Sequence, residues 1–179
     1  MALSIIGGAW VVADRAGLSD VGGGGINAGL LPSVGEQAPE LVTYDVGGNL
    51  VRLSALRGQP VWLNFWGSWC GPCRAEMPEL QRAYEQLAPR GVVMLAVSLQ
   101  ETPKQARDYA ALNGATFPVL ADPALFPADQ FPDIAETANR WQIRNFPTHL
   151  FIDAEGVVRA VVITPMDLRT AVRYGELIL

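Results

Sequence analysis

The sequence predicts an α/β fold in which a central, mostly parallel β-sheet is covered by helices on both faces. The chain has 179 residues, the length of one domain with some additions. Half of the residues are hydrophobic and 17% are charged, so a packed core can form. Short apolar runs alternate with helical patterns, an order that produces a mostly parallel sheet, which an antiparallel hairpin can close.

The elements of the first half follow from turn residues and apolar runs, and the domain is expected to begin near Pro32. Gly47 and Gly48 separate two strand-like segments and indicate a hairpin. The run PVWLNFW is typical of a buried central strand, and Pro78 is expected to kink the helix that follows it. In chain order we expect hairpin strands at 41–45 and 49–53, a strand at 60–66, a helix at 70–87, a strand at 92–99 and a helix at 103–113.

The second half adds a short helix, a hairpin and a final helix. The hairpin turns at Ala154, Glu155 and Gly156, a loop length that joins antiparallel strands. The expected ranges are 134–141 for the short helix, 148–153 and 157–163 for the strands, and 165–177 for the last helix. These elements complete one domain without an internal repeat.

The segment 1–31 differs in composition from the rest of the chain and is expected to lie outside the domain. Four consecutive glycines at 22–25 favour a linker, because glycine gives the backbone great freedom. A phosphate-binding loop is disfavoured, since no strand precedes the glycines and no Lys-Ser or Lys-Thr follows them. The apolar residues 3–13 are too few for a membrane span and lack the features of a signal peptide. They are either the remnant of a membrane anchor or an added N-terminal strand.

The charge and the cysteine content exclude two classes of protein. The 13 basic residues are scattered among 18 acidic ones, with a net charge of −5, so nucleic-acid binding is not expected. Two cysteines are too few for a small secreted protein held together by disulfides. Because Cys70 and Cys73 are separated by two residues, they form either a redox pair or half of a metal site.

The two cysteines lie in the segment WGSWCGPCRAE at 66–76, which follows a buried strand and opens a helix. A helix N-terminus presents unpaired N–H groups and the positive end of the helix dipole, and both stabilise a thiolate. We therefore expect Cys70 to attack a disulfide, and Cys73, deeper in the helix, to resolve the mixed disulfide. Pro72 suits the first helical turn, where its missing N–H costs nothing.

Two other interpretations of the cysteine pair are an inert disulfide and a zinc half-site. A structural zinc site needs four ligands, whereas the chain offers two cysteines and one histidine, His149. We therefore expect no metal and a structural role for His149 on a strand. No cofactor is expected besides the redox-active disulfide of Cys70 and Cys73.

Four short motifs follow one another along the domain. They are LSALRG at 53–58, LNFW at 63–66, WCGPC at 69–73 with Glu76 and Pro78 behind it, and FPT at 146–148 leading into LFID. In order and spacing the chain resembles the thioredoxin superfamily from Pro32 to its end, and within it the TlpA/ResA-type proteins. The resemblance implies a thioredoxin-like three-layer α/β/α sandwich with a central mixed sheet, an extra N-terminal hairpin and an insertion before the cis-proline strand.

The resemblance also implies further site residues. Pro147 would be a cis proline that faces the disulfide, whereas the sequence alone favours an ordinary trans proline. Phe146 would lie beside the sulfurs, and the backbone there would bind an extended substrate segment. Trp69, Gly71 and Pro72 would complete the substrate-binding surface. Phe146 is bulkier than the usual residue at its position, which leaves the substrate preference open.

Two polar positions concern the proton of Cys73. Thioredoxin has a buried acid on the strand before the motif, whereas this chain has Asn64, which cannot exchange protons. Glu76 lies three residues after Cys73 on the same helix face, and ResA-like proteins have a functional glutamate at this spacing. We expect Glu76 to tune or relay the Cys73 proton. The alternative is a solvated glutamate that the helix dipole favours.

The segment DPALFPADQFPD at 122–133 is an insertion relative to a minimal thioredoxin fold. Its aspartates lack the regular spacing of a calcium-binding loop. Phe126 and Phe131 either anchor this loop or border a substrate groove, and we prefer anchoring. Trp66 is expected to pack in the core rather than bind a cofactor.

The leading functional interpretation is an enzyme, a thiol–disulfide oxidoreductase that reduces or exchanges protein disulfides. Its partners would be protein thiols or disulfides and a thiol electron donor, and we expect a monomer with a membrane tether at the N-terminus. The resemblance implies a location outside the cytoplasm, in the periplasm or on the outer face of the membrane, and a role in cytochrome c maturation. The alternatives are a thiol oxidant or isomerase, and a redox-sensing binding module that uses 122–133. A peroxidase is disfavoured, because the Pro-Thr-Cys setting of peroxiredoxins is missing.

Overall fold

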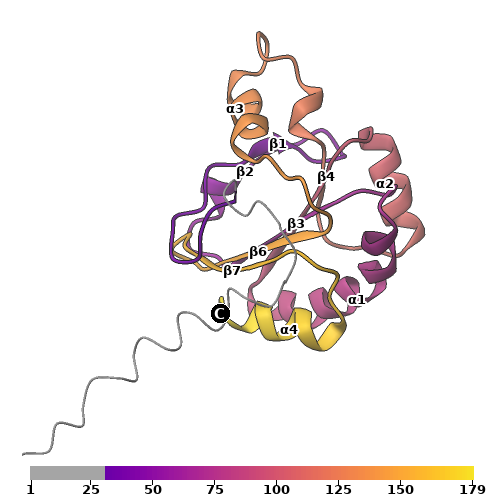
Figure 1. Ribbon diagram of the computed structural model, residues 1–179, viewed down its shortest axis with the longest axis vertical. Coiled ribbons are helices and arrows are strands. Elements are labelled where there is room, and N and C mark those ends of the chain that lie inside the picture. The colour runs from indigo at the N-terminus through magenta and orange to yellow at the C-terminus, as the bar shows by residue number, and fades with distance from the viewer. Residues whose placement is uncertain (1–30) are drawn as a thin grey trace, which may run out of the picture.

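A mixed five-stranded sheet forms the centre of the protein, with the strand order β5-β4-β3-β6-β7 (Figure 1). The computed structural model describes residues 31–179, so the expectations for residues 1–30 lie outside the described residues. The strands are β3 (Val61–Trp66), β4 (Val93–Ser98), β5 (Val119–Leu120), β6 (Thr148–Ile152) and β7 (Val158–Val162). Strands β3, β4 and β5 are parallel, and β6 and β7 run antiparallel to their neighbours. The short strand β5 is an element that the sequence pattern does not predict.

Strand β3 is buried along its whole length, because it lies in the middle of the sheet and both faces are covered. Its side chains alternate between the two faces, as strand geometry requires. Trp62 and Trp66 join the core on one side of the sheet, and Leu63 and Phe65 join the core on the other side. The predicted core position of Trp66 is confirmed.

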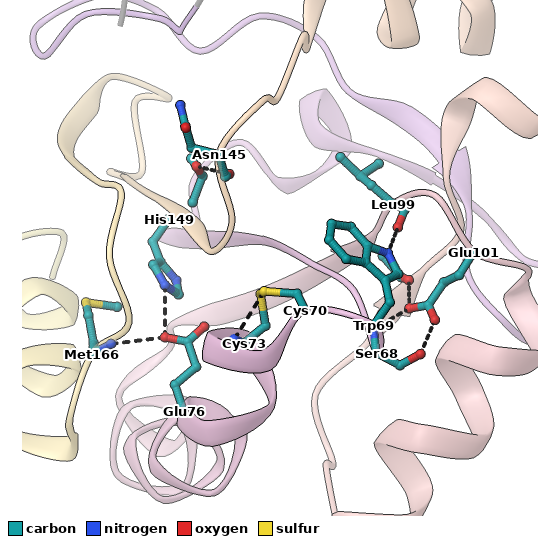
Figure 2. Close-up of a disulfide and its surroundings, with 12 residues drawn as sticks. Ser68, Trp69, Cys70, Cys73, Glu76, Leu99, Glu101, Asn145, His149 and Met166 are labelled. Carbon is teal, nitrogen blue, oxygen red and sulfur yellow. Dashed lines mark hydrogen bonds and ion pairs between the residues drawn. A yellow bond between two sulfur atoms is a disulfide. The ribbon is translucent and has the colours of Figure 1, made fainter. Parts of the chain in front are cut away.

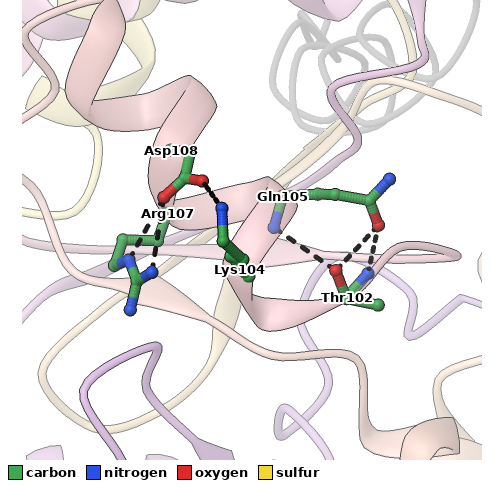
Figure 3. A network of polar contacts seen from close by, with 5 residues as sticks. All are labelled: Thr102, Lys104, Gln105, Arg107 and Asp108. Carbon is green, nitrogen blue, oxygen red and sulfur yellow. Dashed lines mark hydrogen bonds and ion pairs between the residues drawn. The ribbon is translucent and has the colours of Figure 1, made fainter.

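Three helices cover the first face, namely α1 (Gly71–Leu87), α2 (Pro103–Leu112) and α4 (Leu168–Glu176). Helices α1 and α4 lie side by side (Figure 1). Helix α2 begins with a reciprocal capping box, in which the Thr102 side chain and the Gln105 side chain each accept a backbone N–H (Figure 3). Helix α4 begins three residues later than predicted, because Asp167 accepts the Thr170 N–H and caps it. Pro78 lies inside α1 on its exposed side.

The second face is covered by the N-terminal hairpin and by the segment after α3. The predicted hairpin is confirmed as β1 (Val42–Tyr44) and β2 (Leu50–Arg52), and the 3₁₀ turn η2 (Leu53–Leu56) follows it. Helix α3 (Pro132–Arg140) begins two residues earlier than predicted. After it, Trp141 packs against Phe65 and donates its indole N–H to the Glu40 carbonyl at 3.0 Å. These contacts fix the hairpin on the sheet.

The insertion at 122–133 forms the 3₁₀ turn η4 (Pro123–Leu125) and leads into α3. The Phe126 and Phe131 rings contact each other, with centroids 5.5 Å apart, and both contact Tyr44 on β1, at 5.3 Å and 6.1 Å. The two phenylalanines therefore hold the insertion on the hairpin, which is the anchoring arrangement preferred from the sequence.

Candidate active site around Cys70 and Cys73

Cys70 and Cys73 form a disulfide at the N-terminus of α1, with their Cα atoms 5.3 Å apart (Figure 2). Cys70 is the N-cap residue of this helix, and its Sγ accepts the Cys73 N–H at 3.2 Å. Gly71 and Pro72 form the exposed first turn. Cys70 is 5% exposed and Cys73 is 1% exposed, so the more exposed of the two residues is the one expected to be the nucleophile. The same N–H group and the helix dipole would stabilise a Cys70 thiolate.

The loop 67–69 between β3 and Cys70 is held by Glu101, which lies just after β4. Glu101 accepts the Ser68 N–H at 2.8 Å and also the hydroxyl groups of Ser68 and Ser98. Sequence reasoning missed this residue. The signal was nevertheless present, because parallel neighbouring strands end at the same edge of a sheet, which places the loops after β3 and β4 together.

Trp69 and Phe146 form an aromatic pair beside the disulfide. The Trp69 side chain is held by its indole N–H, which donates to the Leu99 carbonyl at 2.9 Å, although the residue is 48% exposed. Gly67 leaves room for the indole, since a Cβ there would lie 2.4 Å from its Nε1. The Phe146 ring meets the indole edge-on, with centroids 5.0 Å apart. The structure thus brings together two residues that were expected to contact the substrate.

Pro147 precedes β6, and the Phe146–Pro147 peptide bond is cis, as expected. Strand β6 is antiparallel to β3, and Thr148 is the register partner of Phe65. The start of β6 therefore lies at the end of β3 that leads to Cys70. Thr148 fixes the preceding turn, because its hydroxyl donates to the Asn145 carbonyl at 2.8 Å.

Glu76 lies on the inner face of α1, one turn after Cys73 (Figure 2). It is 2% exposed, so the alternative of a solvated glutamate is wrong. Its Oε2 accepts the Met166 N–H at 3.0 Å and lies 3.3 Å from His149 Nε2. Its Oε1 is buried and has no hydrogen-bond partner within residues 31–179.

His149 is fully buried on β6, and its Nδ1 accepts the indole N–H of Trp62 at 3.3 Å. It is on a strand, as predicted, but it faces Glu76, which the sequence did not indicate. Asn64 is its register partner on β3, and both side-chain polar atoms of Asn64 are buried without a partner in the described part of the chain. Cross-strand partners share a face of the sheet, so a polar cluster lies among apolar side chains behind the disulfide.

The sequence of the chain is similar to that of known thiol-disulfide oxidoreductases. Residues 34–161 match the AhpC/TSA family. The chain is 35% identical to the thiol-disulfide oxidoreductase ResA of Geobacillus kaustophilus, over 80% of this chain and 77% of that protein. It is 33% identical to the thiol-disulfide oxidoreductase ResA of Bacillus subtilis, over 80% of this chain and 78% of that protein.

Solved structures show the same fold. The crystal structure of a thiol:disulfide interchange protein of the thioredoxin family from Chlorobium tepidum matches with a TM-score of 0.67 and 24% identity, over 82% of this chain and 98% of that chain. StoA from Bacillus subtilis matches with a TM-score of 0.59 and 23% identity, over 80% of this chain and 98% of that chain. The chain belongs to the AhpC/TSA family and is a thiol–disulfide oxidoreductase with a thioredoxin-like fold.

Proposed function

We propose that the protein is a dithiol reductant that breaks disulfides in protein substrates outside the cytoplasm. The observation that supports this most directly is the unequal setting of the two sulfurs. Cys70 caps the helix next to the half-exposed Trp69, whereas Cys73 is enclosed. The Cys70 thiolate attacks a substrate disulfide, forms a mixed disulfide and releases one substrate thiolate. Cys73 then attacks the Cys70 sulfur, and the second substrate thiolate leaves.

The substrate surface in this proposal consists of the exposed turn of α1 and the turn before β6. An extended substrate segment would lie along the backbone at Phe146 and Pro147, as in peptide recognition by strand addition. Trp69, Gly71 and Pro72 would contact its side chains. The edge-on packing of Trp69 against Phe146 supports this assignment, since it orders an apolar surface next to the sulfurs.

Glu76 is proposed to accept the proton of Cys73 when Cys73 becomes the nucleophile. Two features support this role. Cys73 and Glu76 lie on the same buried face of α1, and one Glu76 oxygen has no hydrogen-bond partner within residues 31–179. A candidate base must lie within hydrogen-bond reach of the proton or be linked to it through one water molecule. Asn64 could not accept the proton of the Cys73 thiol, because a side-chain amide does not act as a base.

The reducing direction and the location rest on resemblance. The Gly71-Pro72 pair resembles that of reducing thioredoxin-like proteins, and the TlpA/ResA-type proteins act outside the cytoplasm. Within residues 31–179, no helix has the length and apolar character needed to cross a membrane. The tether in this proposal is the N-terminal segment 1–31. We propose a monomer that receives electrons from a thiol donor, with an apocytochrome c disulfide in cytochrome c maturation as one candidate substrate.

Reduction of insulin by dithiothreitol, followed as turbidity, tests this function. The wild-type protein is expected to accelerate the reaction, and Cys70→Ser is expected to abolish the acceleration, because the first bond to the substrate is lost. Because dithiothreitol keeps the dithiol reduced, an oxidant would accelerate this reaction too, but it alone would also speed the oxidative refolding of a reduced protein. A binding module without turnover would accelerate neither reaction.

A further inference from the structure

We propose that His149 is a positioning residue for the Cys73 proton. Trp62 holds His149 in one tautomer, and His149 in turn holds one oxygen of Glu76, which leaves the other oxygen to serve Cys73. This role rests on the proposed function of Glu76 and extends it to two residues of the sheet core. Both Trp62 and His149 are fully buried, so neither is accessible to a substrate.

The contact with Trp62 determines which nitrogen of His149 carries the proton. An indole N–H is a donor only, and it lies 3.3 Å from His149 Nδ1. Nδ1 must therefore be the unprotonated acceptor, and the proton of the neutral ring is on Nε2. A doubly protonated ring would direct a second N–H at the indole N–H. His149 consequently carries its N–H on Nε2, the nitrogen that lies 3.3 Å from Glu76 Oε2.

The two oxygens of Glu76 are in different surroundings. Oε2 has the Met166 N–H at 3.0 Å and His149 Nε2 at 3.3 Å. The His149 N–H is not aligned with Oε2 in the disulfide form, and such contacts commonly tighten in the reacting state. Oε1 has no hydrogen-bond partner within residues 31–179 and lies on the side of the carboxylate toward the Cys73 turn (Figure 2).

This arrangement makes a buried carboxylate usable as a base. An isolated carboxylate that is removed from water is strongly destabilised unless donors surround it. The Met166 N–H on Oε2, joined by the His149 N–H when that contact tightens, stabilises the anion and leaves Oε1 available. The Cys73 S–H proton passes to Oε1, and the Cys73 thiolate bonds to the Cys70 sulfur. The bond between Cys70 and the substrate breaks, its electron pair leaves with the substrate sulfur, and Glu76 later returns its proton to solvent.

The other ionisable groups near this cluster are already engaged elsewhere. From α1, Cys73 and Glu76 face His149. Glu79, one turn further along α1, accepts the Leu168 N–H at 3.2 Å, and Asp167 caps α4. From β3 the neighbour is Asn64, which does not titrate.

The two chemical steps can be timed separately with dithiobis(nitrobenzoate). Attack by Cys70 on the reagent releases one coloured thiolate, and resolution by Cys73 releases a second. With His149→Leu we expect the second phase to slow by about tenfold, a typical effect of removing a partner that orients a reactive group. The first phase should change by less than about twofold, since Cys70 does not depend on Glu76. His149→Gln retains a donor and should recover most of the second-phase rate.

A double-mutant cycle shows whether His149 acts through Glu76. In a Glu76→Gln background, His149→Leu should cause no further slowing of the second phase. The proposal for His149 would be overturned if the two substitutions slowed the second phase by the product of their separate effects. It would also be overturned if Glu76→Gln slowed the second phase and His149→Leu did not. Either result would leave the reductase function intact. A wild-type protein without a second phase would instead contradict the reductase function itself. Thr137→Val, which removes a buried side-chain hydrogen bond to Val42 far from the cysteines, is the control for general destabilisation.

The tautomer can be observed without altering the core. His149 is the one histidine of the chain, so nitrogen-15 histidine labelling of untagged protein gives a single imidazole signal set. We expect the Nε2–H tautomer at neutral pH in the wild-type protein and a shift toward Nδ1–H in Trp62→Phe. An Nδ1–H or doubly protonated ring in the wild-type protein would overturn the proposal, even if a kinetic variant failed to fold.

Discussion

At the scale of single residues, the site separates the two sulfurs by their surroundings. Cys70 caps the helix and borders the aromatic pair of Trp69 and Phe146. Cys73 belongs to the buried face of α1 and packs in the core. The difference in exposure is small in the disulfide form, 5% against 1%, but it has the direction that the chemistry needs. The sulfur that attacks a substrate disulfide must be accessible to the substrate, whereas the sulfur that resolves the mixed disulfide can be buried.

This separation predicts which variant accumulates an intermediate. Cys73→Ser retains the nucleophile but cannot resolve the mixed disulfide, so a covalent adduct with an oxidised protein substrate should build up. Cys70→Ser should form little adduct, because Cys73 is enclosed. Mass spectrometry under non-reducing conditions measures both. Equal adduct formation by the two variants would show that the assignment of nucleophile and resolving thiol is wrong.

The sequence predicted part of this residue-level arrangement. The cysteine spacing and the helix start are local features, and the interval of three residues places Glu76 on the Cys73 face of α1. The contact between His149 and Glu76 could not be predicted in this way. It depends on how β6 registers with β3 and on how closely α1 packs over both strands, which are long-range properties.

At the scale of elements, the site is built at the edge where β3 and β4 end. Glu101, from the loop after β4, accepts three hydrogen bonds from Ser68 and Ser98 and thereby holds the loop before Cys70. Such bonds to a carboxylate are stronger than those between neutral groups. The position of the nucleophile therefore depends on an element that carries no sulfur chemistry.

Glu101→Gln should weaken the hydrogen bonds that hold the loop 67–69. We expect a loss of about 1–3 kcal/mol in the free energy of unfolding, since one charged acceptor is replaced by a neutral group that also carries donors. The rate of the Cys70 phase should fall severalfold as the loop 67–69 loosens. Urea unfolding and the first phase with dithiobis(nitrobenzoate) measure the two effects. An unchanged Cys70 rate in a destabilised protein would show that Glu101 serves stability alone.

The hairpin of β6 and β7 carries the cis proline and is closed by Asp153. Its Oδ1 accepts the Val157 N–H at 2.8 Å, and its Oδ2 pairs with Arg159. Gly156 completes the turn with φ of +83°, and the Arg57 side chain occupies the space where a Cβ would be. Burial acts to raise the pKa of Asp153, but the Val157 N–H and the Arg159 guanidinium outweigh it and hold the pKa below its ordinary value.

A lowered pKa means that Asp153 stabilises the fold when it is ionised. This contribution is complete above the unfolded value of about 3.9 and is lost as the pH falls through the folded pKa. Asp153→Asn should therefore cost about 1–2 kcal/mol at neutral pH. The difference between wild type and variant should shrink below about pH 4. Urea unfolding at several pH values measures it, and a constant difference across the range would contradict this role.

Most elements could be predicted because their signals are local. Apolar runs marked β3 and β4, and glycine turns marked both hairpins. Strand β5 has two residues, Val119 and Leu120, which pair with β4 on one side and with Asp45 at the hairpin turn on the other. Its existence is a tertiary effect that no short window contains. The start of α3 at Pro132 is instead a local signal, proline in the first helical turn, that the expected range 134–141 leaves out.

At the scale of the whole molecule, the two faces of the sheet are covered by different kinds of element. Helices α1, α2 and α4 enclose the sulfurs and the polar cluster, while the hairpin of β1 and β2 and the segment after α3 cover the other face. The resemblance to thioredoxin-like proteins predicted the hairpin and the insertion as additions to a common sheet. The sequence did not indicate that they would contact each other, because Tyr44 and Phe126 are far apart in the chain.

The insertion should therefore contribute to stability rather than to catalysis. Replacing both Phe126 and Phe131 by alanine removes the aromatic contacts with Tyr44, and we expect a loss of about 2–4 kcal/mol, because both side chains are only partly buried. The rate of insulin reduction should stay within about twofold. Chemical unfolding and the turbidity assay provide the comparison. Full stability combined with lost activity would identify the insertion as a substrate or partner surface.

The central claim, that the cysteine couple works as a reductant, is tested most directly by its reduction potential. The protein is equilibrated with thiol buffers of known potential, and the reduced cysteines are trapped by alkylation. A reductant is expected to have a value near that of thioredoxin, about −270 mV. A value near about −120 mV, as in the oxidant DsbA, would contradict the proposed direction. Failure of Cys70 and Cys73 to form a disulfide would remove the redox function altogether.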